Sequence, residues 1–489
     1  GRARALPPLD GAGFDLKWER HEPPCPRQSC LGRELLSVLP LFALPNPVVM
    51  LGLAVAIPAA VMATRVPFLL CLGFVIFSFF RIHEAFPVLM PLRIPQLLAI
   101  PTLGVLVWHF FGTRRLKPYW SRELSWFAAF FGLVTVGVIF ASNKPLALAY
   151  WTATYVKIGI MTLAIAWLTT EPGHFARASR ALVLAGLAVS YVTLSNKANG
   201  IGLVEGTRVT IGRDMQSVLG DPNDLSLVLL FPMAFAVSLA TTKGLGKLSN
   251  LFGAVAVVAV LMAILATQSR GGLLGIMTVF GIFGLRLVKS KLLLGAVGGV
   301  AMLVLFAAAG ISGRSSGGAA EDGIDESAMG RIYAWGAATQ MAITRPLTGV
   351  GLDNFLSNYY FYSSHWDGKN HAVHSTWFGV LGETGFPGLA VFIGMIVVSL
   401  RSALKASRIL DRTPGVSPNA RAMGRALVAG LAACCVAGTF LTQGFTWPFY
   451  IQIALTAAIA RYANQVMQNA TESATAAAPT SENPAVSTR

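Results

Sequence analysis

The chain has few charged side chains for its length. Asp, Glu, Lys and Arg together make up 12% of its 489 residues, whereas an ordinary soluble domain contains about 25%. A soluble enzyme of this size needs more polar groups to cover its surface, so this class is excluded. The hydrophobic share of 54% also excludes a disordered chain.

Acidic residues are the scarcer of the two charge types. The 22 acidic side chains are outnumbered by 38 Lys and Arg, which gives a net charge of +16. In a soluble protein this excess would suggest a nucleic-acid partner. In a chain with so few charges, its meaning depends on where the basic residues fall between apolar runs. We expect no nucleic-acid partner here.

Cysteine is also scarce. Cys25 and Cys30 lie in the Pro- and Arg-rich residues 1–33, without nearby partners at metal-ligand spacing. We therefore expect no metal site and no cofactor. The other cysteines lie in apolar runs, where cysteine packs as a small core residue; they are Cys71, Cys434 and Cys435.

Long apolar runs are what the sequence has in abundance. A membrane-spanning helix needs about 20 mostly apolar residues, and these runs are continuous rather than alternating as in barrel strands. The sequence therefore predicts an all-α polytopic membrane protein with roughly 12 transmembrane helices. The runs lie near residues 48–63, 66–80, 94–112, 124–142, 149–169, 181–195, 220–240, 249–267, 271–288, 291–311, 375–400, 425–443 and 447–463.

The two ends and one long connection divide the chain into five parts. Residues 1–33 and 467–489 show no periodic apolar face, and we expect both to be flexible tails. We expect the transmembrane bundle to consist of residues 34–311 and 374–466. The loop 312–373 connects its two parts.

Basic residues concentrate in alternate connections between the apolar runs. By the positive-inside rule, these connections face the cytoplasm. The opposite connections are expected at the periplasm or cell exterior, and they are 81–93, 142–148, 196–219, 268–272 and 312–373. The basic residues on the inner side are Arg114, Arg115, Lys117, Arg122, Arg177, Arg180, Lys243, Lys247, Arg286, Lys289, Lys291, Arg401, Lys405, Arg408, Arg412, Arg421 and Arg425.

Composition changes most in the outer loop 312–373. Its part SAMGRIYAWGAATQMAIT has apolar residues near helical spacing and ends just before Pro346. We expect an amphipathic helix on the membrane face, either as a packed cover or as a lid facing substrate. The aromatic residues within 359–366 are typical of interfacial anchors. The expected apolar face of the helix is Met329, Ile332, Tyr333, Gly336, Met341 and Ile343.

His374 lies where this loop meets the next apolar run. A histidine at the water boundary can exchange protons while its pKa is tuned by the apolar surroundings. Its ordinary pKa of about 6.5 suits a general base at neutral pH. On residue type alone, a structural role at a helix end is the commoner alternative.

Three arginines on the expected outer side are candidates for binding an anion: Arg270, Arg331 and Arg213. Arg270 sits in a connection almost too short to be a loop. An arginine at membrane depth costs roughly 2.5 kcal/mol or more unless it has a partner or a function. Taken singly, each arginine is more simply explained by snorkelling or a salt bridge. Together they offer the planar, permanent charge that suits pyrophosphate, and they would keep a nearby histidine neutral.

Signatures of nucleotide chemistry are absent from the sequence. There is no GxxxxGK[ST] motif, and GxG fragments such as 349–351 lie outside a strand–helix context. No DxD-like carboxylate pair marks a metal on the outer side. The substrate should therefore carry its own leaving group, such as a polyprenyl pyrophosphate-linked sugar.

At these residues the chain resembles the bacterial O-antigen ligase family, which belongs with the O-antigen polymerases and certain protein O-oligosaccharyltransferases. The strongest match is His374-Ser375-x9-Gly385-x-x-Gly388. It is preceded by GR-x3-W at 330–335 and RPLTGVG at 345–351. The SRGG at 269–272 and the DPND at 221–224 also resemble positions in such proteins, and the resemblance covers about residues 66–443.

This resemblance implies a metal-independent, inverting glycosyltransferase with a helical fold similar to the GT-C membrane enzymes. It would act in lipopolysaccharide biosynthesis on the periplasmic face of the bacterial inner membrane, among membrane lipids. The donor would be an undecaprenyl pyrophosphate-linked glycan, and the acceptor a sugar hydroxyl of lipid A-core. His374 matches the catalytic histidine, and Arg270 and Arg331 match arginines that hold the pyrophosphate. Arg213 is added from its position and charge.

Three other functions stay open at this stage. A polymerase would join glycan repeat units to one another, and a protein O-oligosaccharyltransferase would use Ser or Thr acceptors. A transporter would need charged or broken helices at the bilayer midplane. Lys157 is the one candidate of that kind in the sequence, so transport is the least favoured function.

Overall fold

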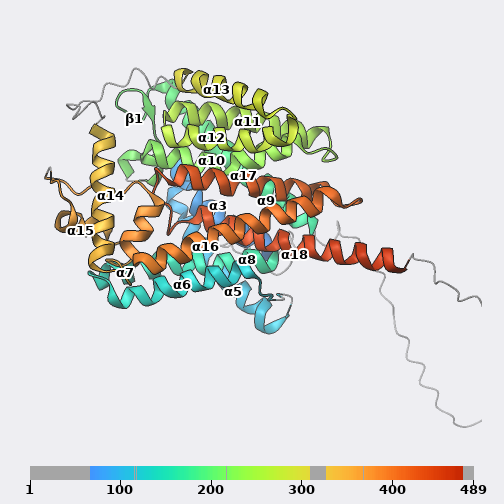
Figure 1. Cartoon of the computed structure of the whole chain (residues 1–489), viewed down its shortest axis with the longest axis horizontal. Helices are drawn as coiled ribbons and strands as arrows, with labels where there is room; N and C mark the ends of the chain where they lie inside the picture. Colours follow the sequence, from blue (N-terminus) through green and yellow to red (C-terminus); the bar gives the residue numbers. More distant parts are fainter. Residues whose placement is uncertain are drawn as a thin grey trace, which may run out of the picture. The chain divides into compact units, whose positions relative to one another are not determined.

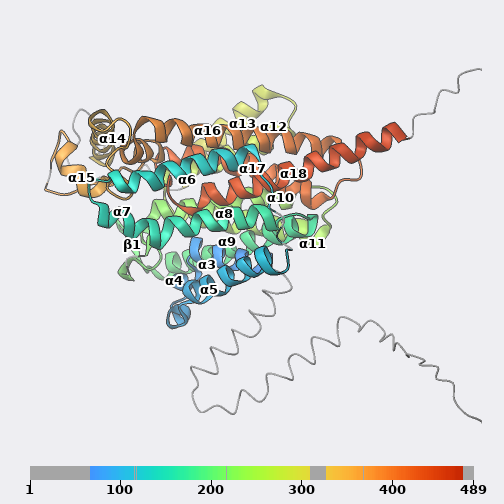
Figure 2. The ribbon, with the colours of Figure 1, turned by 90° about the horizontal axis from the view of Figure 1, so that it is seen from below.

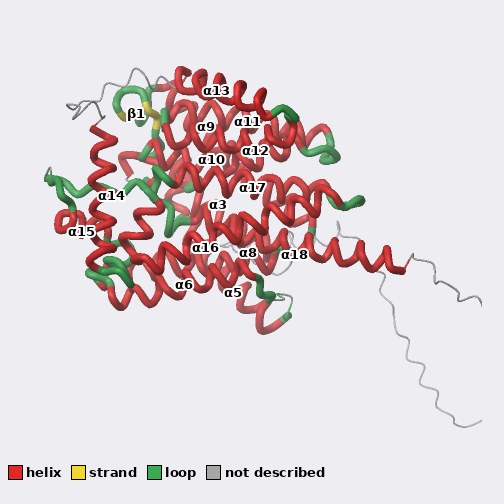
Figure 3. Tube along the Cα trace, viewed as in Figure 1, coloured by secondary structure: helices red, strands yellow, loops and turns green. Residues whose placement is uncertain are grey.

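The computed structural model describes residues 67–476 except 115, 117, 216, 309–325 and 367. Nearly all of this part is helical, and its one sheet is a two-stranded hairpin (Figure 3). The expected all-α polytopic membrane fold is confirmed. The apolar run at 48–63 and the tail at 1–33 lie outside the described residues.

Helices before residue 200 follow the apolar runs and begin at recognisable caps. The side chains of Ser121 and Asn143 accept hydrogen bonds from the first turns of α6 and α7. The helices are α3 (Pro67–Phe79), α4 (Ile82–Ala85), α5 (Ile94–Val107), α6 (Arg122–Phe140), α7 (Lys144–Tyr150), α8 (Val156–Leu168) and α9 (Pro172–Asn199). Short 3-10 or π segments are η2 (Pro87–Leu92), η3 (Trp108–Gly112) and η4 (Trp151–Tyr155).

The remainder of the chain begins with a hairpin of β1 (Leu203–Val204) and β2 (Arg208–Val209), which pair antiparallel. Two single turns follow, η5 (Arg213–Met215) and η6 (Val218–Gly220). The helices are α10 (Pro222–Thr241), α11 (Lys247–Thr267), α12 (Arg270–Leu287), α13 (Lys291–Ala308), α14 (Glu326–Thr344), α15 (Phe355–Tyr362), α16 (Thr376–Arg412), α17 (Pro418–Gly438) and α18 (Trp447–Ala476).

The helical segments agree with the apolar runs read from the sequence. Nine segments of the described chain are long and apolar enough to cross a membrane, and α3 and most of α13 are shorter apolar helices. Every run predicted after residue 66 falls on a helix. The helix α18 continues to Ala476, past the boundary at 466 that the apolar run suggests, because Met, Gln and Ala there are good helix formers.

The helices α10 and α17 form the centre of the bundle. The helix α10 packs against α9, α11, α12 and α17, while α17 also packs against α12, α16 and α18. Figures 1 and 2 show these long helices running side by side. In α10, 83% of the most apolar stretch is buried, so its largely apolar sequence is explained by protein contacts on all sides.

Connections expected on the outer side meet at one end of the bundle. The hydroxyl of Thr207 donates to the side-chain oxygen of Gln268 at 2.9 Å. The backbone N–H of Ser142 donates to the carbonyl of Val350 at 2.8 Å. We call this end, where α12 and α16 begin, the His374 end.

Connections expected on the inner side meet at the opposite end, where α12 and α16 finish. Asp411 there pairs with Arg286 at 2.7 Å and with Arg425 at 2.8 Å. We call it the Arg401 end. The connections that the charge pattern assigned to opposite sides thus lie at opposite ends of the bundle. Which end faces the cytoplasm stays a prediction.

The helix α14 runs crosswise to the bundle helices at the His374 end (Figures 1 and 2). A helix was expected here, and its existence is confirmed, but of its predicted apolar face Met341 is buried while the two isoleucines are not. Ile332 and Ile343 are 47% and 60% exposed. Small side chains instead let α14 approach α16 closely. A prediction from the positions of large apolar residues does not identify such a face of alanines. The packed residues are Ala334, Ala337, Ala338, Met341 and Ala342.

The short helix α15 was not predicted. Its residue Tyr359, expected as an interfacial anchor, is instead 1% exposed and packs near Phe355. The buried carboxylate of Glu383, on α16, accepts hydrogen bonds from the backbone N–H of Asp353 at 3.0 Å and of Phe355 at 3.1 Å. This carboxylate therefore fixes the start of α15 against the bundle.

Candidate active site

Two of the predicted arginines, Arg270 and Arg331, line one small pocket at the His374 end. Its volume is about 70 Å³, and it lies where α10, α12 and α14 meet the β-hairpin and the segment after α17. We call it the Arg270 pocket. It is lined by Glu205, Arg208, Asn223, Ser269, Arg270, Gly271, Arg331, Phe440 and Leu441.

The start of α12 places Arg270 in this pocket. Only Gln268 and Ser269 separate α12 from α11, and the Ser269 side chain caps α12 by accepting from the N–H of Gly272 at 3.3 Å. A Cβ on Gly272 would overlap the hydroxyl of Ser226 on α10. In the SRGG sequence, Ser269 therefore caps α12, Arg270 lines the pocket, and Gly272 allows the close contact with α10.

The start of α10 forms the neighbouring wall. Asp221 caps it by accepting from the N–H groups of Asn223 at 2.7 Å and Asp224 at 3.2 Å. The Asn223 side chain accepts from Nη2 of Arg208 at 3.0 Å. Residues at the starts of both α10 and α12 therefore line the pocket, and the partial positive charge of a helix N-terminus favours an anion nearby.

Arg208 is held rigidly by the ends of three elements. Its Nε donates to the carbonyl of Thr267 at 3.2 Å, and its Nη1 lies 3.5 Å from a carboxylate oxygen of Glu205. The side chain is 7% exposed. We did not select Arg208 from the sequence, although it stands in the same outer connection as Arg213. No sequence signal distinguishes the two, because the strand that begins at Arg208 is only two residues long.

The helix α14 brings Arg331 to the pocket and is fixed one turn later by Trp335. The indole Nε1 of Trp335 donates to the carbonyl of Val373 at 3.0 Å. Its ring stacks on Phe378 with centroids 5.1 Å apart and planes 8° from parallel. Residues four apart share one face of a helix, so GR-x3-W joins the pocket arginine to the segment that carries His374.

His374 is half-buried just before the start of α16, where Ser375 caps the helix. Its φ of 42° is in the left-handed region, which few residues with a Cβ occupy. Burial lowers the pKa of its imidazole below the ordinary value, and the positive charges of Arg331 and His371 lower it further, while Asp221 opposes them. The ring is therefore neutral at pH 7.

The segment after α17 ties His374 to the start of α10. The Thr376 hydroxyl donates to the carbonyl of Leu441 at 2.7 Å and accepts from the N–H of Gln443 at 3.0 Å. The Gln443 side chain donates to the carboxylate of Asp224 at 3.2 Å. The beginning of α16 is thus positioned by hydrogen bonds that also reach the wall of the Arg270 pocket.

The glycines of the His374 motif have a structural explanation. Gly385 has a φ of 67° and breaks α16, and a Cβ there would overlap the carbonyl oxygen of Pro346. The N–H of Val350 donates to the carbonyl of Gly382 at 2.9 Å, and that of Phe386 to Pro346 at 2.9 Å. The RPLTGVG segment therefore packs into the break in α16, and the two motifs form one structural unit.

The structure places Arg213 differently from the other two predicted arginines. It lies in η5, it is exposed, and its Nη1 donates to the carbonyl of Gly220 at 3.4 Å. It is not among the residues that line the Arg270 pocket. His374 does not line that pocket either, but nearby Thr376 is hydrogen-bonded to the carbonyl of Leu441, which does line it.

Guanidinium groups and helix N-termini together suit a doubly charged phosphate ester or pyrophosphate. A neutral imidazole beside them suits proton abstraction from a hydroxyl. An arrangement of this kind can hold an anionic leaving group and remove a proton. These are the two requirements of glycosyl transfer from a phosphate-activated sugar.

Comparison with known proteins adds one match. No curated protein matches the chain. Residues 255–393 match the family model Wzy_C, described as O-antigen ligase. The matched stretch includes Arg270, Arg331 and His374 and extends past the break in α16, and the family performs glycosyl transfer of the ligase or polymerase type. Over these residues the chain is therefore similar to the O-antigen ligase family.

Proposed function

We propose that this protein is an O-antigen ligase that transfers a glycan from undecaprenyl pyrophosphate to a sugar hydroxyl of lipid A-core. The reaction is a metal-independent, inverting transfer at the periplasmic face of the bacterial inner membrane, and the His374 end faces the periplasm. The observation that carries the proposal is that Arg270 and Arg331, from different helices, line one pocket, and that a hydrogen bond from Thr376 ties the segment that begins with His374 to Leu441 in its wall.

The pyrophosphate of the donor occupies the Arg270 pocket. Arg270 and Arg331 hold its oxygens, and the first N–H groups of α12 add a partial positive charge. Arg208 is already held by Asn223 and the Thr267 carbonyl, so it acts by keeping the wall rigid and positive. Arg213, outside the pocket, contacts the donor further along its length.

His374 removes the proton from the acceptor hydroxyl. The oxygen then attacks the anomeric carbon of the donor sugar, a new glycosidic bond forms, and the bond from that carbon to the pyrophosphate oxygen breaks. The electron pair and negative charge leave with undecaprenyl pyrophosphate, where the arginines stabilise them. Attack opposite to the leaving group inverts the configuration of the anomeric carbon.

The test supplies purified protein with labelled lipid-linked glycan and three acceptors: lipid A-core, free glycan repeat units and a Ser/Thr peptide. We expect transfer to lipid A-core and its loss in His374→Gln, while the nearby His371→Gln variant stays close to wild type. Transfer only to glycan would identify a polymerase, and transfer only to peptide a protein O-oligosaccharyltransferase. Movement of lipid-linked glycan across vesicles without transfer would identify a transporter and overturn the proposal.

A further inference from the structure

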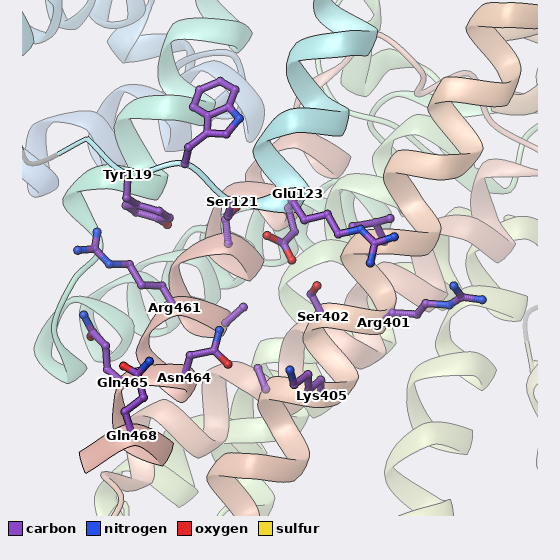
Figure 4. Close-up of a pocket in the computed structure, with 16 residues that line it drawn as sticks. Tyr119, Ser121, Glu123, Arg401, Ser402, Lys405, Arg461, Asn464, Gln465 and Gln468 are labelled. Atoms are coloured by element: carbon purple, nitrogen blue, oxygen red, sulfur yellow. The ribbon is translucent and has the colours of Figure 1, made fainter. Parts of the chain in front are cut away.

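A second, larger pocket lies at the Arg401 end of the bundle (Figure 4). Its volume is about 660 Å³, and it lies between the start of α6, the second half of α16 and the middle of α18. The 27 residues from His374 to Arg401, at about 1.5 Å per residue along α16, separate this pocket from His374 by roughly 40 Å. That distance exceeds the thickness of a bilayer core, about 30 Å. We call it the Arg401 pocket.

The walls of the Arg401 pocket carry an excess of positive charge. Its cationic residues are Arg122, Arg401, Lys405 and Arg461, and Glu123 is its one acidic residue. Arg122, Arg401 and Lys405 are exposed and form no ion pair with any residue that the structure describes. Like charges gathered without counter-charges repel one another, so an anion placed among them is stabilised.

Arg461 has an unfilled hydrogen-bonding position. Its guanidinium lies over the ring of Tyr119, 4.3 Å from the centroid. Its Nη1 is buried and has no hydrogen-bond partner among the described residues. A buried charged donor without an acceptor is costly. An oxygen atom of a bound anion would remove that cost.

Neutral donors complete the pocket. Figure 4 shows Asn464 extending from α18 toward Lys405 on α16, with Ser402 beside them. Trp120, at the rim, is 59% exposed, and its indole donates to the hydroxyl of Ser125 at 2.8 Å. An exposed tryptophan next to cationic side chains is typical of the level of lipid head groups.

We propose that the Arg401 pocket binds the phosphate group of an anionic phospholipid. Guanidinium and amide donors suit the oxygens of a phosphodiester, and basic pockets between transmembrane helices suit anionic head groups. The pocket lies between three membrane helices at the expected lipid level, where acyl chains can extend along the helix surfaces. This proposal is independent of the reaction at the His374 end.

Native mass spectrometry of the full chain in mild detergent tests the proposal with phosphatidylglycerol, phosphatidylcholine and, separately, inorganic phosphate. We expect phosphatidylglycerol to bind on the order of tenfold more tightly than phosphatidylcholine, since both carry the phosphodiester but the choline cation of the second lipid is repelled by the cationic wall. If inorganic phosphate binds and phosphatidylglycerol does not, the phosphate chemistry of the site stands, but the lipid source is wrong.

Variants locate the binding and guard against misfolding. Lys405→Gln leaves the Arg461–Tyr119 contact intact and should weaken phosphatidylglycerol binding several-fold, and Arg461→Lys should weaken it while keeping the charge. Arg408→Gln removes an exposed cation of α16 outside the pocket and should change nothing. Equal binding of the two lipids with no binding of phosphate, or equal losses in the Lys405 and Arg408 variants, would overturn the proposal.

Discussion

The indole of Trp335 donates a hydrogen bond to the carbonyl of Val373, the residue immediately before His374. Trp335 lies one helical turn after Arg331 on α14, so this bond couples the pocket arginine to the histidine through a single helix face. This hydrogen bond links α14 directly to the backbone just before α16 begins.

Trp335→Phe keeps the stacking on Phe378 and removes this hydrogen bond. A neutral hydrogen bond contributes about 0.5–1.5 kcal/mol, so we expect kcat to fall up to about tenfold, with KM for the donor changed little. Trp151→Phe is the matched control, because it loses an indole bond to Thr135 elsewhere in the bundle. A rise in KM together with a fall in kcat and in the unfolding temperature would instead indicate a general loss of structure.

The pH dependence of the reaction should respond to Arg331. As the pH falls through the pKa of His374, the imidazole gains a proton and ceases to act as a base. The pKa is lowered by burial, Arg331 and His371 and is raised by Asp221, so the wild-type acid limb lies below about pH 6.5. Arg331→Gln removes a positive charge that disfavours imidazolium, so the acid limb of residual activity should move to higher pH.

The control for this shift is Arg345→Gln, since Arg345 donates to the carbonyl of Phe140 and does not contribute to the pKa of His374. Rates measured from pH 4.5 to 8 with saturating donor provide the profile. If the acid limb of Arg331→Gln lies at the same pH as that of the wild type, the loss of rate at low pH is due to protonation of a group other than His374.

Arg270 and Arg213 should differ in their effect on donor turnover. Loss of one donor to a developing negative charge costs about 2–4 kcal/mol by analogy with oxyanion holes. We therefore expect Arg270→Gln to lower kcat on the order of 30- to 1000-fold. Arg213→Gln, outside the pocket, should lower it far less. Equal losses in single-turnover assays would place both arginines on the same phosphate group.

Gly385→Ala should destabilise the fold rather than the chemistry. Its φ of 67° and the overlap with the Pro346 carbonyl make a Cβ unfavourable, at a cost on the order of 1–3 kcal/mol. Gly281→Ala is the control, since a Cβ at that mid-helix position meets no atom within 4 Å. It should be neutral or stabilising by up to about 1 kcal/mol. Thermal unfolding in detergent distinguishes the two variants.

Sequence periodicity was sufficient for the helices because apolar length is a local property. The runs after residue 66 all became helices, and the charge pattern separated the two ends correctly. The packed face of α14 could not be predicted, since which side of a helix is buried depends on its neighbour. Here the neighbour is α16, and it accepts a face of alanines instead of isoleucines.

The candidate site was only partly predictable for a related reason. Arg270 was conspicuous because a cation in a very short connection is expensive, and His374 because it ends a loop. Arg208 gave no such signal, since its position depends on hydrogen bonds to Thr267 and Asn223 from other elements. The glycine motif was visible in the sequence, but its purpose, the break at Gly385, required the Pro346 contact.

The crosswise helix α14 contributes Arg331, while Arg270 belongs to α12 within the bundle. A ligand held by both arginines would link the two helices. Thermodynamic linkage is reciprocal, so the free energy by which donor binding favours the docked position of α14 equals the free energy by which docking strengthens donor binding. A donor would then slow hydrogen exchange along α14, and its release after transfer would free the helix again.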